Sequence, residues 1–230
     1  MLILSIDTST RGCSVSLVGD ASLISSYELF TDKSSSSMLT TLMQNCVEHA
    51  GFTLADLDAI AVAMGPGSYT GLRVGVSTAK GLCYALDKPL LAINTLEAMA
   101  LQLGKFYENH LLCPMIDARR MEVYAAIFDS KNNIVLPTQA VILTENSFEE
   151  LLNTNKIVFF GDGSAKFKAL VGGNPNATFP EHDIFPSAKT VGLLAIDAFY
   201  AGKFEDVAAF EPYYLKDFMS PAPKKSKTLL

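Results

Sequence analysis

Short apolar runs and helical spacings alternate along the first half of the chain, with turn residues between them. Extended apolar segments bounded by turns predict strands, and apolar positions three and four apart predict helices. The predicted strands span residues 2–7, 14–18, 23–30, 59–63 and 89–93. The predicted helices span residues 34–50 and 69–86, and a third helix begins after a cap at Asn94 or Thr95. The order β-β-β-α-β-α-β-α predicts a mixed sheet covered on both faces.

The second half repeats this order in reduced form. Met115-Ile116-Asp117 ends a strand as Leu4-Ser5-Ile6-Asp7 does, which indicates an internal duplication. The predicted strands span residues 112–117, 122–128, 134–143 and 157–160, and the predicted helices span residues 147–152 and 188–202. Only the weaker apolar stretch 165–171 follows the last strand closely, so we expect a smaller second copy. The pattern predicts two α/β lobes, residues 1–104 and 105–220, and a basic tail over residues 221–230.

Length and composition fit a globular protein of one large domain or two small ones. The chain has 230 residues, of which 49% are hydrophobic and 18% charged, enough for a sizeable core. Because no apolar run approaches a membrane span and no secretory pattern is present, we expect a cytoplasmic protein without a membrane partner. Four widely spaced cysteines in apolar surroundings predict buried free thiols. The net charge of -6 argues against a protein that grips nucleic acid alone, and we expect the basic tail to be disordered.

The most distinctive motif is a glycine-rich loop between the predicted strand 59–63 and the predicted helix 69–86. The residues that form this loop are Gly65, Pro66, Gly67, Ser68, Thr70 and Gly71. Ser68 or Thr70 is placed to cap the helix, and the free N–H groups of a helix start suit a phosphate or carboxylate. A tight strand-to-helix turn is the alternative interpretation. The spacing matches neither the Walker A motif nor the dinucleotide fingerprint.

Motifs in all parts of the chain resemble one protein family. A duplicated unit with an aspartate after each first strand resembles the actin, Hsp70 and sugar-kinase superfamily, a ribonuclease-H-like fold. Within that superfamily, four segments are similar to the TsaB (YeaZ) family. They are Ile6-Asp7-Thr8-Ser9, the string from Gly65 to Gly75, Ile116-Asp117-Ala118-Arg119, and Pro212-Tyr213-Tyr214-Leu215-Lys216. The likeness covers nearly the whole chain in order.

This resemblance implies a role in tRNA modification. TsaB proteins are bacterial cytoplasmic subunits required for threonylcarbamoylation of adenosine 37, the modification t6A, in tRNAs that read ANN codons. The paralogous partner TsaD carries the transferase chemistry and a metal site, and the small ATPase TsaE joins the pair. The resemblance therefore implies a non-catalytic dimerisation partner that forms a homodimer when alone. It implies contact with tRNA only through the complex, and ATP and a metal ion on the partner subunits.

The residues of the chain are those expected of a protein without catalytic activity of its own. His49, His110 and His182 are widely separated, without the paired histidines of a metal-binding helix, so we expect no metal ligand here. Ser9 stands where a phosphate-binding hairpin needs glycine, so we do not expect the chain to hydrolyse ATP by itself. Asp7 and Asp117 would either face the interlobe cleft or cap backbone amides at strand ends, and we favour capping. The residues assigned to a vestigial nucleotide cleft are Asp7, Ser9, Asp117, Gly161 and Gly163, and weak nucleotide binding stays open.

Without catalysis, function must lie on a surface, and the helices predicted over residues 34–50 and 69–86 are the candidates. Both carry more apolar residues than one stripe requires, which is typical of a face that pairs with a partner. The residues expected at this interface are Met38, Leu39, Leu42, Met43, Arg73, Val76 and Lys80. Arg73 and Lys80 would bind a partner carboxylate or an RNA phosphate. The alternative is that both apolar stripes only face their own sheet.

Two enzymatic functions are weighed against this scaffold. A glycoprotease-like peptidase would need a nucleophile elbow, but Ser68 does not lie in a G-x-S-x-G sequence and no histidine is committed to it. A small-molecule kinase of the same superfamily would need the missing phosphate-loop glycines. The leading hypothesis is a non-catalytic subunit that binds and activates TsaD.

Overall fold

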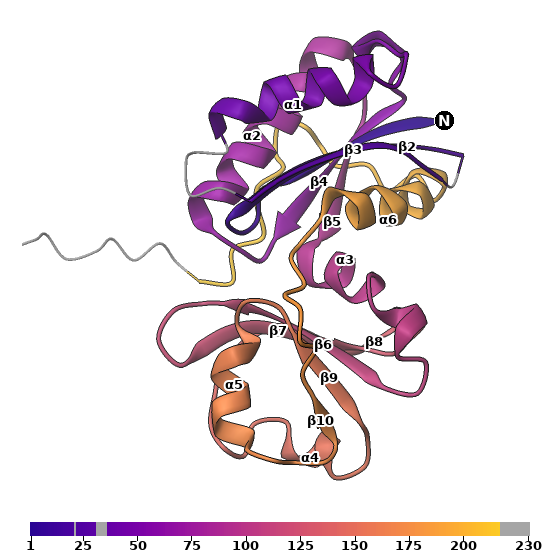
Figure 1. The fold of residues 1–230 in the computed structure, drawn as a ribbon. Helices are drawn as coiled ribbons and strands as arrows, with labels where there is room; N and C mark the ends of the chain where they lie inside the picture. Colours follow the sequence, from indigo (N-terminus) through magenta and orange to yellow (C-terminus); the bar gives the residue numbers. More distant parts are fainter. Residues whose placement is uncertain (21, 31–35, 217–230) are drawn as a thin grey trace, which may run out of the picture.

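A computed structural model describes residues 1–20, 22–30 and 36–216. It contains two five-stranded mixed sheets, one above the other in Figure 1, with two helices between them. The first two residues of the helix predicted over 34–50 and the predicted basic tail lie outside the described residues.

The first sheet has the strand order β3-β2-β1-β4-β5. Its strands are β1 (Leu2–Asp7), β2 (Gly12–Gly19), β3 (Ser22–Phe30), β4 (Ala59–Gly65) and β5 (Leu90–Asn94). The first three strands pair antiparallel, and β4 and β5 continue parallel to β1. The five strands predicted in the first half and their mixed sheet are therefore confirmed.

The second sheet repeats this topology, with the order β10-β9-β6-β7-β8. Its strands are β6 (Leu111–Asp117), β7 (Glu122–Phe128), β8 (Ile134–Ile142), β9 (Ile157–Phe160) and β10 (Ala177–Thr178). In the repeat β6 takes the place of β1, and the two-residue β10 takes the place of β5. The duplication and the smaller second copy are confirmed, but β10 was not predicted because two residues carry no periodic signal.

Helices α1 (Ser36–Glu48) and α2 (Tyr69–Leu86) cover the outer face of the first sheet. Their apolar side chains enter one core with the alternate residues of β1, β2 and β4 that point to that face. This core contains Leu39, Leu42, Met43 and Val76, which are all at most 6% exposed. The prediction that these four residues face a partner is therefore wrong, because the sheet beneath the two helices already buries them.

The helices between the two sheets are exchanged between the halves of the chain. Helix α3 (Thr95–Leu101) comes from the first half, yet Leu96, Met99 and Ala100 share a core with β6, β7 and β9. Helix α6 (Ala188–Tyr200) comes from the second half, and it packs on β1, β2, β4 and β5. Figure 1 shows both helices between the sheets. The predicted lobe of residues 105–220 is therefore wrong for α6, which belongs to the first sheet.

The outer face of the second sheet is covered by α4 (Glu149–Leu152) and α5 (Ser164–Val171), which pack around an aromatic cluster. Two single 3-10 turns, Leu54–Asp56 and Gly104–Phe106, lie in connections. The four cysteines are buried free thiols, as predicted. In the described part of the chain, no helix is long and apolar enough to cross a membrane.

Candidate functional site

The glycine-rich loop packs against the turn that follows β1. A Cβ atom on Gly67 would lie 2.3 Å from the carbonyl oxygen of Ser9, and one on Gly71 would lie 2.0 Å from that of Thr8. The backbone N–H of Ser68 donates to the Ser9 carbonyl at 2.6 Å. Thr8 Oγ1 donates to the carbonyl of Gly71 at 2.7 Å. The close approach for which these glycines are needed is to the chain itself.

The capping of α2 agrees with the sequence. Ser68 is the N-cap, and its hydroxyl accepts a hydrogen bond from the N–H of Gly71 at 3.3 Å. Thr70, the other predicted cap, is an exposed residue of the first helical turn. Gly65 has a φ of 116°, which favours glycine, and its peptide bond to Pro66 is cis. The loop thus turns the chain sharply from a buried strand into a helix.

Asp7 acts as a buried cap at the end of β1. Its side chain is almost fully buried, and Oδ1 accepts hydrogen bonds from the N–H of Ser9 at 2.8 Å and from Ser9 Oγ at 2.7 Å. Oδ2 has no hydrogen-bond partner among the described residues. The pKa of Asp7 is raised to about 6, mainly by burial and to a smaller extent by the charge of Glu28, against the lowering effect of the two Ser9 bonds. The favoured prediction, that Asp7 caps the backbone, is confirmed.

Asp117 occupies the matching position after β6, with partners from its own sheet and α5. Oδ1 accepts from the N–H of Arg119 at 2.6 Å and pairs with Lys166 Nζ at 2.6 Å. Its own N–H donates to Asp162 Oδ1 at 2.9 Å, and desolvation raises the pKa of Asp162. Within residues 1–20, 22–30 and 36–216, no hydrogen bond joins Asp7 to Asp117. The two aspartates cap separate hairpins.

The glycines assigned to the vestigial cleft also serve internal packing. A Cβ atom on Gly161 would lie 2.4 Å from the Met115 carbonyl, and one on Gly163 would lie 3.1 Å from the N–H nitrogen of Asp117. The second lobe therefore repeats the packing of the first, in which a glycine turn presses on the aspartate-bearing hairpin. In the described part of the chain, no three His, Cys, Asp or Glu residues form a group that could hold a metal ion.

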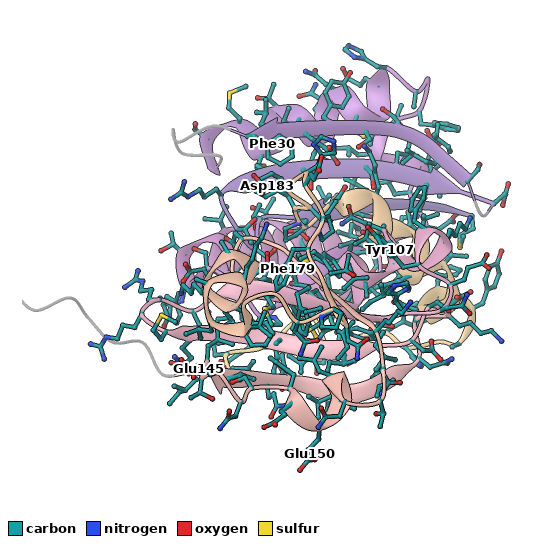
Figure 2. All side chains as sticks on the ribbon, turned by 60° about the horizontal axis from the view of Figure 1, so that its bottom comes forward. Phe30, Tyr107, Glu145, Glu150, Phe179 and Asp183 are labelled. Atoms are coloured by element: carbon teal, nitrogen blue, oxygen red, sulfur yellow. The ribbon has the colours of Figure 1, made fainter. Side chains whose placement is uncertain are left out.

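A pocket of about 220 Å³ lies between the edge of β3 and the start of α6. Figure 2 shows Phe30 of β3 close to Asp183, and both line the pocket. Glu28 accepts from the hydroxyl of Ser187, the N-cap of α6, at 2.5 Å and lies 3.4 Å from Lys189 Nζ. The pocket residues were not predicted from the sequence, although a serine before an apolar helical run signals such a cap.

Arg73 and Lys80, the two basic residues predicted to bind a partner, contact the end of this chain instead. We call residues 203–216, which follow α6, the C-terminal strap. Lys80 Nζ donates to the carbonyl oxygens of Ala208 at 3.1 Å and Phe210 at 2.8 Å. Arg73 Nε donates to the hydroxyl of Tyr214 at 3.3 Å. The prediction that Lys80 offers its charge to a partner is wrong in this conformation, because two carbonyls of the strap already accept from it.

The solvent-facing side of α1 and α2 is built mainly from small and polar residues. Met38 is 44% exposed and Tyr84 is 87% exposed. Ser77 and Gly81 are also exposed on α2, and open space surrounds the position of a Cβ atom on Gly81. Thr41 and Gln44 are exposed on α1. We call this surface, made by the exposed residues of the two helices, the α1–α2 face.

Comparison with known proteins places the chain in a family. The family model described as "TsaD: tRNA N6-adenosine threonylcarbamoyltransferase" matches residues 30–210. The tRNA threonylcarbamoyladenosine biosynthesis protein TsaB of Escherichia coli (strain K12) is 30% identical over 222 residues, which cover 94% of this chain and 95% of the relative. The protein of the same name from Bacillus subtilis (strain 168) is 33% identical over 176 residues, which cover 74% of this chain and 75% of the relative. The chain belongs to the TsaB (YeaZ) family.

The fold comparison agrees with this family. A crystal structure described as an uncharacterized protein with similarity to peptidase YEAZ from Pseudomonas aeruginosa superimposes with a TM-score of 0.82 at 24% identity, covering 94% of this chain and 99% of that one. The resemblance drawn from the motifs is confirmed, and so is the α/β fold of two lobes with the same strand order. In this TsaB family member, glycines of the Gly65–Gly75 string pack α2 against the turn between β1 and β2.

Proposed function

We propose that this protein is the non-catalytic scaffold subunit of a t6A-forming complex and that it binds and activates TsaD. The relatives of this chain are named for tRNA threonylcarbamoyladenosine biosynthesis, and the matching family model is that of the transferase. In this proposal TsaE joins the pair, and ATP and the metal ion are held by the partner subunits. tRNA is reached only through the complex.

The packing of Asp7 and Asp117, the two aspartates assigned to a vestigial nucleotide cleft, supports a role without catalysis. Asp7 is buried as a backbone cap, and Asp117 is paired with Lys166. A side chain that holds a phosphate-bound metal must present oxygen atoms to the ligand, but the Asp7 oxygen that has no hydrogen-bond partner is buried inside the chain. Ser9 adds a hydroxyl that donates to Asp7 at the position where the superfamily needs a bare glycine. We therefore assign the activity of the complex to the partner.

The observation that carries the proposal is the α1–α2 face. Gly81 and Ser77 form a strip of small residues along α2, and the large side chains of Tyr84 on the same helix and Met38 on α1 are exposed. A strip of small residues lets a second helix approach, and large flanking side chains then supply the buried apolar area. We place the contact with TsaD on this face, and the same face would pair two copies of the chain when TsaD is missing.

The experiment compares two substitutions at one position. Gly81→Arg fills the strip, while Gly81→Ala leaves it nearly flat, and a Cβ atom at this position has no atom of the chain within 4 Å. Light scattering on a size-exclusion column would measure the association of each variant with itself and with TsaD from the same organism. Nucleoside mass spectrometry of tRNA would measure t6A formation in the reconstituted complex.

We expect Gly81→Arg to lose both associations and t6A formation, with Gly81→Ala close to the unmodified protein. Both variants should keep the unmodified melting temperature within a few degrees, because residue 81 lies on the solvent side of α2. Normal binding and t6A formation by a folded Gly81→Arg variant would refute the placement on this face. A chain that never associates with TsaD would refute the scaffold itself.

A further inference from the structure

The C-terminal strap leaves the first sheet after α6, and its last described residue contacts the second sheet. It starts beside β5, where the N–H of Glu205 donates to the Leu90 carbonyl at 2.9 Å. It then follows α2 and reaches the hairpin between β6 and β7. Figure 1 shows this yellow segment passing α2 and descending toward the second lobe, away from α3.

The strap is attached firmly to the first lobe. Besides the two carbonyls held by Lys80, the N–H of Tyr213 donates to the Met64 carbonyl at 2.8 Å, at the end of β4. Val207 and Phe210 pack against the core beneath α1 and α2. Three attachments of different kinds therefore fix the strap along the length of α2.

An aromatic and cationic cluster continues this attachment at the start of α2. The guanidinium carbon of Arg73 lies 4.1 Å from the centroid of the Tyr69 ring, and Arg73 Nε donates to the Tyr214 hydroxyl at 3.3 Å. The rings of Tyr69 and Tyr214 have centroids 4.7 Å apart. This cluster orders the strap just before its last described residues, which keeps Lys216 in one place.

The last contact of the strap is with the second lobe. Lys216 Nζ pairs with the carboxylate of Glu122, the first residue of β7, and both side chains are partly buried, at 36% and 22% exposure. The same ammonium lies 6.0 Å from the centroid of the Tyr124 ring. Glu122 is itself held, because its carbonyl accepts from Lys166 of α5 at 3.2 Å. The pair therefore joins two ordered groups from different lobes.

Elsewhere the lobes are joined through the inner helices and through Asn94, the N-cap of α3, whose Nδ2 donates to Thr138 Oγ1 of β8 at 3.0 Å. Helices α3 and α6 contact one another, and Gln102, after α3, donates to the Phe185 carbonyl at 2.9 Å. We propose that the C-terminal strap is an interlobe latch, in which Lys216 and Glu122 hold the angle between the lobes that α3 and α6 alone leave adjustable. The geometry is that of a hinge at the inner helices and a releasable ion pair across from it.

The test measures the distance between the lobes with spin labels in the full chain. Glu48→Cys on α1 and Glu150→Cys on α4, both at exposed positions, provide the labelling sites, and Figure 2 shows Glu150 at the outer end of the second lobe. The native thiols should stay unlabelled at neutral pH, because burial raises the pKa of Cys13 to about 11 and that of Cys83 to about 12. Pulsed electron resonance then gives the interlobe distance distribution.

We expect a single narrow distribution for the labelled parent chain, and a broader one shifted to longer distances for Lys216→Ala. The combined exchange Glu122→Lys with Lys216→Glu should return the narrow distribution, which a simple loss of packing would not. Lys88→Ala, which removes the same charge at the end of α2, is the matched control and should change nothing.

An unchanged distribution for Lys216→Ala, or an exchange variant as broad as the single one, would overturn the latch. If a thermal melt shows that a variant does not fold, the same distance measurement on the labelled parent chain at high salt tests the latch instead. Raising the salt concentration to about 1 M screens a partly exposed ion pair. The latch requires the same broadening there, and a constant distribution would refute it.

Discussion

Gly71 shows how a single residue ties the glycine-rich loop to the rest of the sheet. Its missing side chain leaves room for the Thr8 carbonyl, which a Cβ atom would approach to 2.0 Å, and backbone atoms cannot move aside cheaply. We predict that Gly71→Ala lowers the free energy of unfolding by about 3 kcal/mol, at the upper end of overpacking effects. Urea denaturation measures this change.

Gly81, ten residues along the same helix, is the control for that substitution. A Cβ atom there meets open space, so Gly81→Ala should gain about 0.5–1 kcal/mol from helix propensity. Similar effects at both positions would contradict the argument, because propensity alone would then explain them.

Asp7 makes a separate prediction about pH. Its pKa is raised from 3.8 to about 6, so the folded state holds the proton more tightly than the unfolded chain does. The protonated Asp7 therefore stabilises the folded state fully below pH 4, and this contribution is lost as the pH rises through 6. By linkage this group alone should lower the free energy of unfolding by about 3 kcal/mol over that range.

Asp7→Asn removes the titrating group and keeps an oxygen for the two Ser9 bonds. We therefore expect the variant to gain stability relative to the parent chain as the pH rises from 4 to 7. Parallel curves of unfolding free energy against pH for the two proteins would show that Asp7 does not titrate in this range.

At the scale of elements, the sequence predicts which segments form strands and helices. It does not predict what the apolar face of each helix packs against. Helix α2 begins and ends where the sequence predicts, because Ser68 and the periodic apolar residues mark it clearly. The same periodicity marks Leu42 and Val76 as apolar without saying whether a sheet or a partner covers them. Likewise α6 was predicted, but its apolar stripe does not reveal that the first sheet receives it.

The C-terminal strap forms no helix or sheet strand, and hydrogen-bond donors on α2 hold it in place. Lys80 donates to two carbonyls, and charged hydrogen bonds of this kind contribute about 1.5–3 kcal/mol each when their partners are sheltered. We predict that Lys80→Met releases the strap, so that the amides of Phe210 and Tyr213 exchange hydrogen much faster. Lys88→Met, at the end of the same helix, is the control.

Hydrogen exchange followed by mass spectrometry or nuclear magnetic resonance checks this prediction residue by residue. The amides of β4 and β5 should keep their protection, because the sheet does not depend on the strap for its pairing. Unchanged protection of residues 206–213 in Lys80→Met would mean that the apolar contacts of Val207 and Phe210 suffice to hold the strap.

For the whole molecule, the duplicated topology followed from the sequence, whereas the exchange of inner helices did not. Two sheets of the same strand order arise from repeated patterns around Asp7 and Asp117. Each sheet nevertheless has one face closed by a helix from the other half of the chain, α6 on the first and α3 on the second. The halves are therefore expected to depend on each other for stability.

Removing everything after residue 186 tests that dependence. If α6 belongs to the first sheet, the loss exposes Ile3, Ala61 and Leu91, so the amides of β1 and β4 should lose hydrogen-exchange protection while those of β6 and β9 keep it. If the C-terminal half instead folded as one lobe, the amides of β6 and β9 would lose protection and those of β1 and β4 would keep it. Gly192→Leu gives the same test in the full chain, because its side chain would meet Ser5 and Val18 and lift α6 from the sheet. Loss of protection confined to β6 and β9 in either protein would contradict the exchanged arrangement.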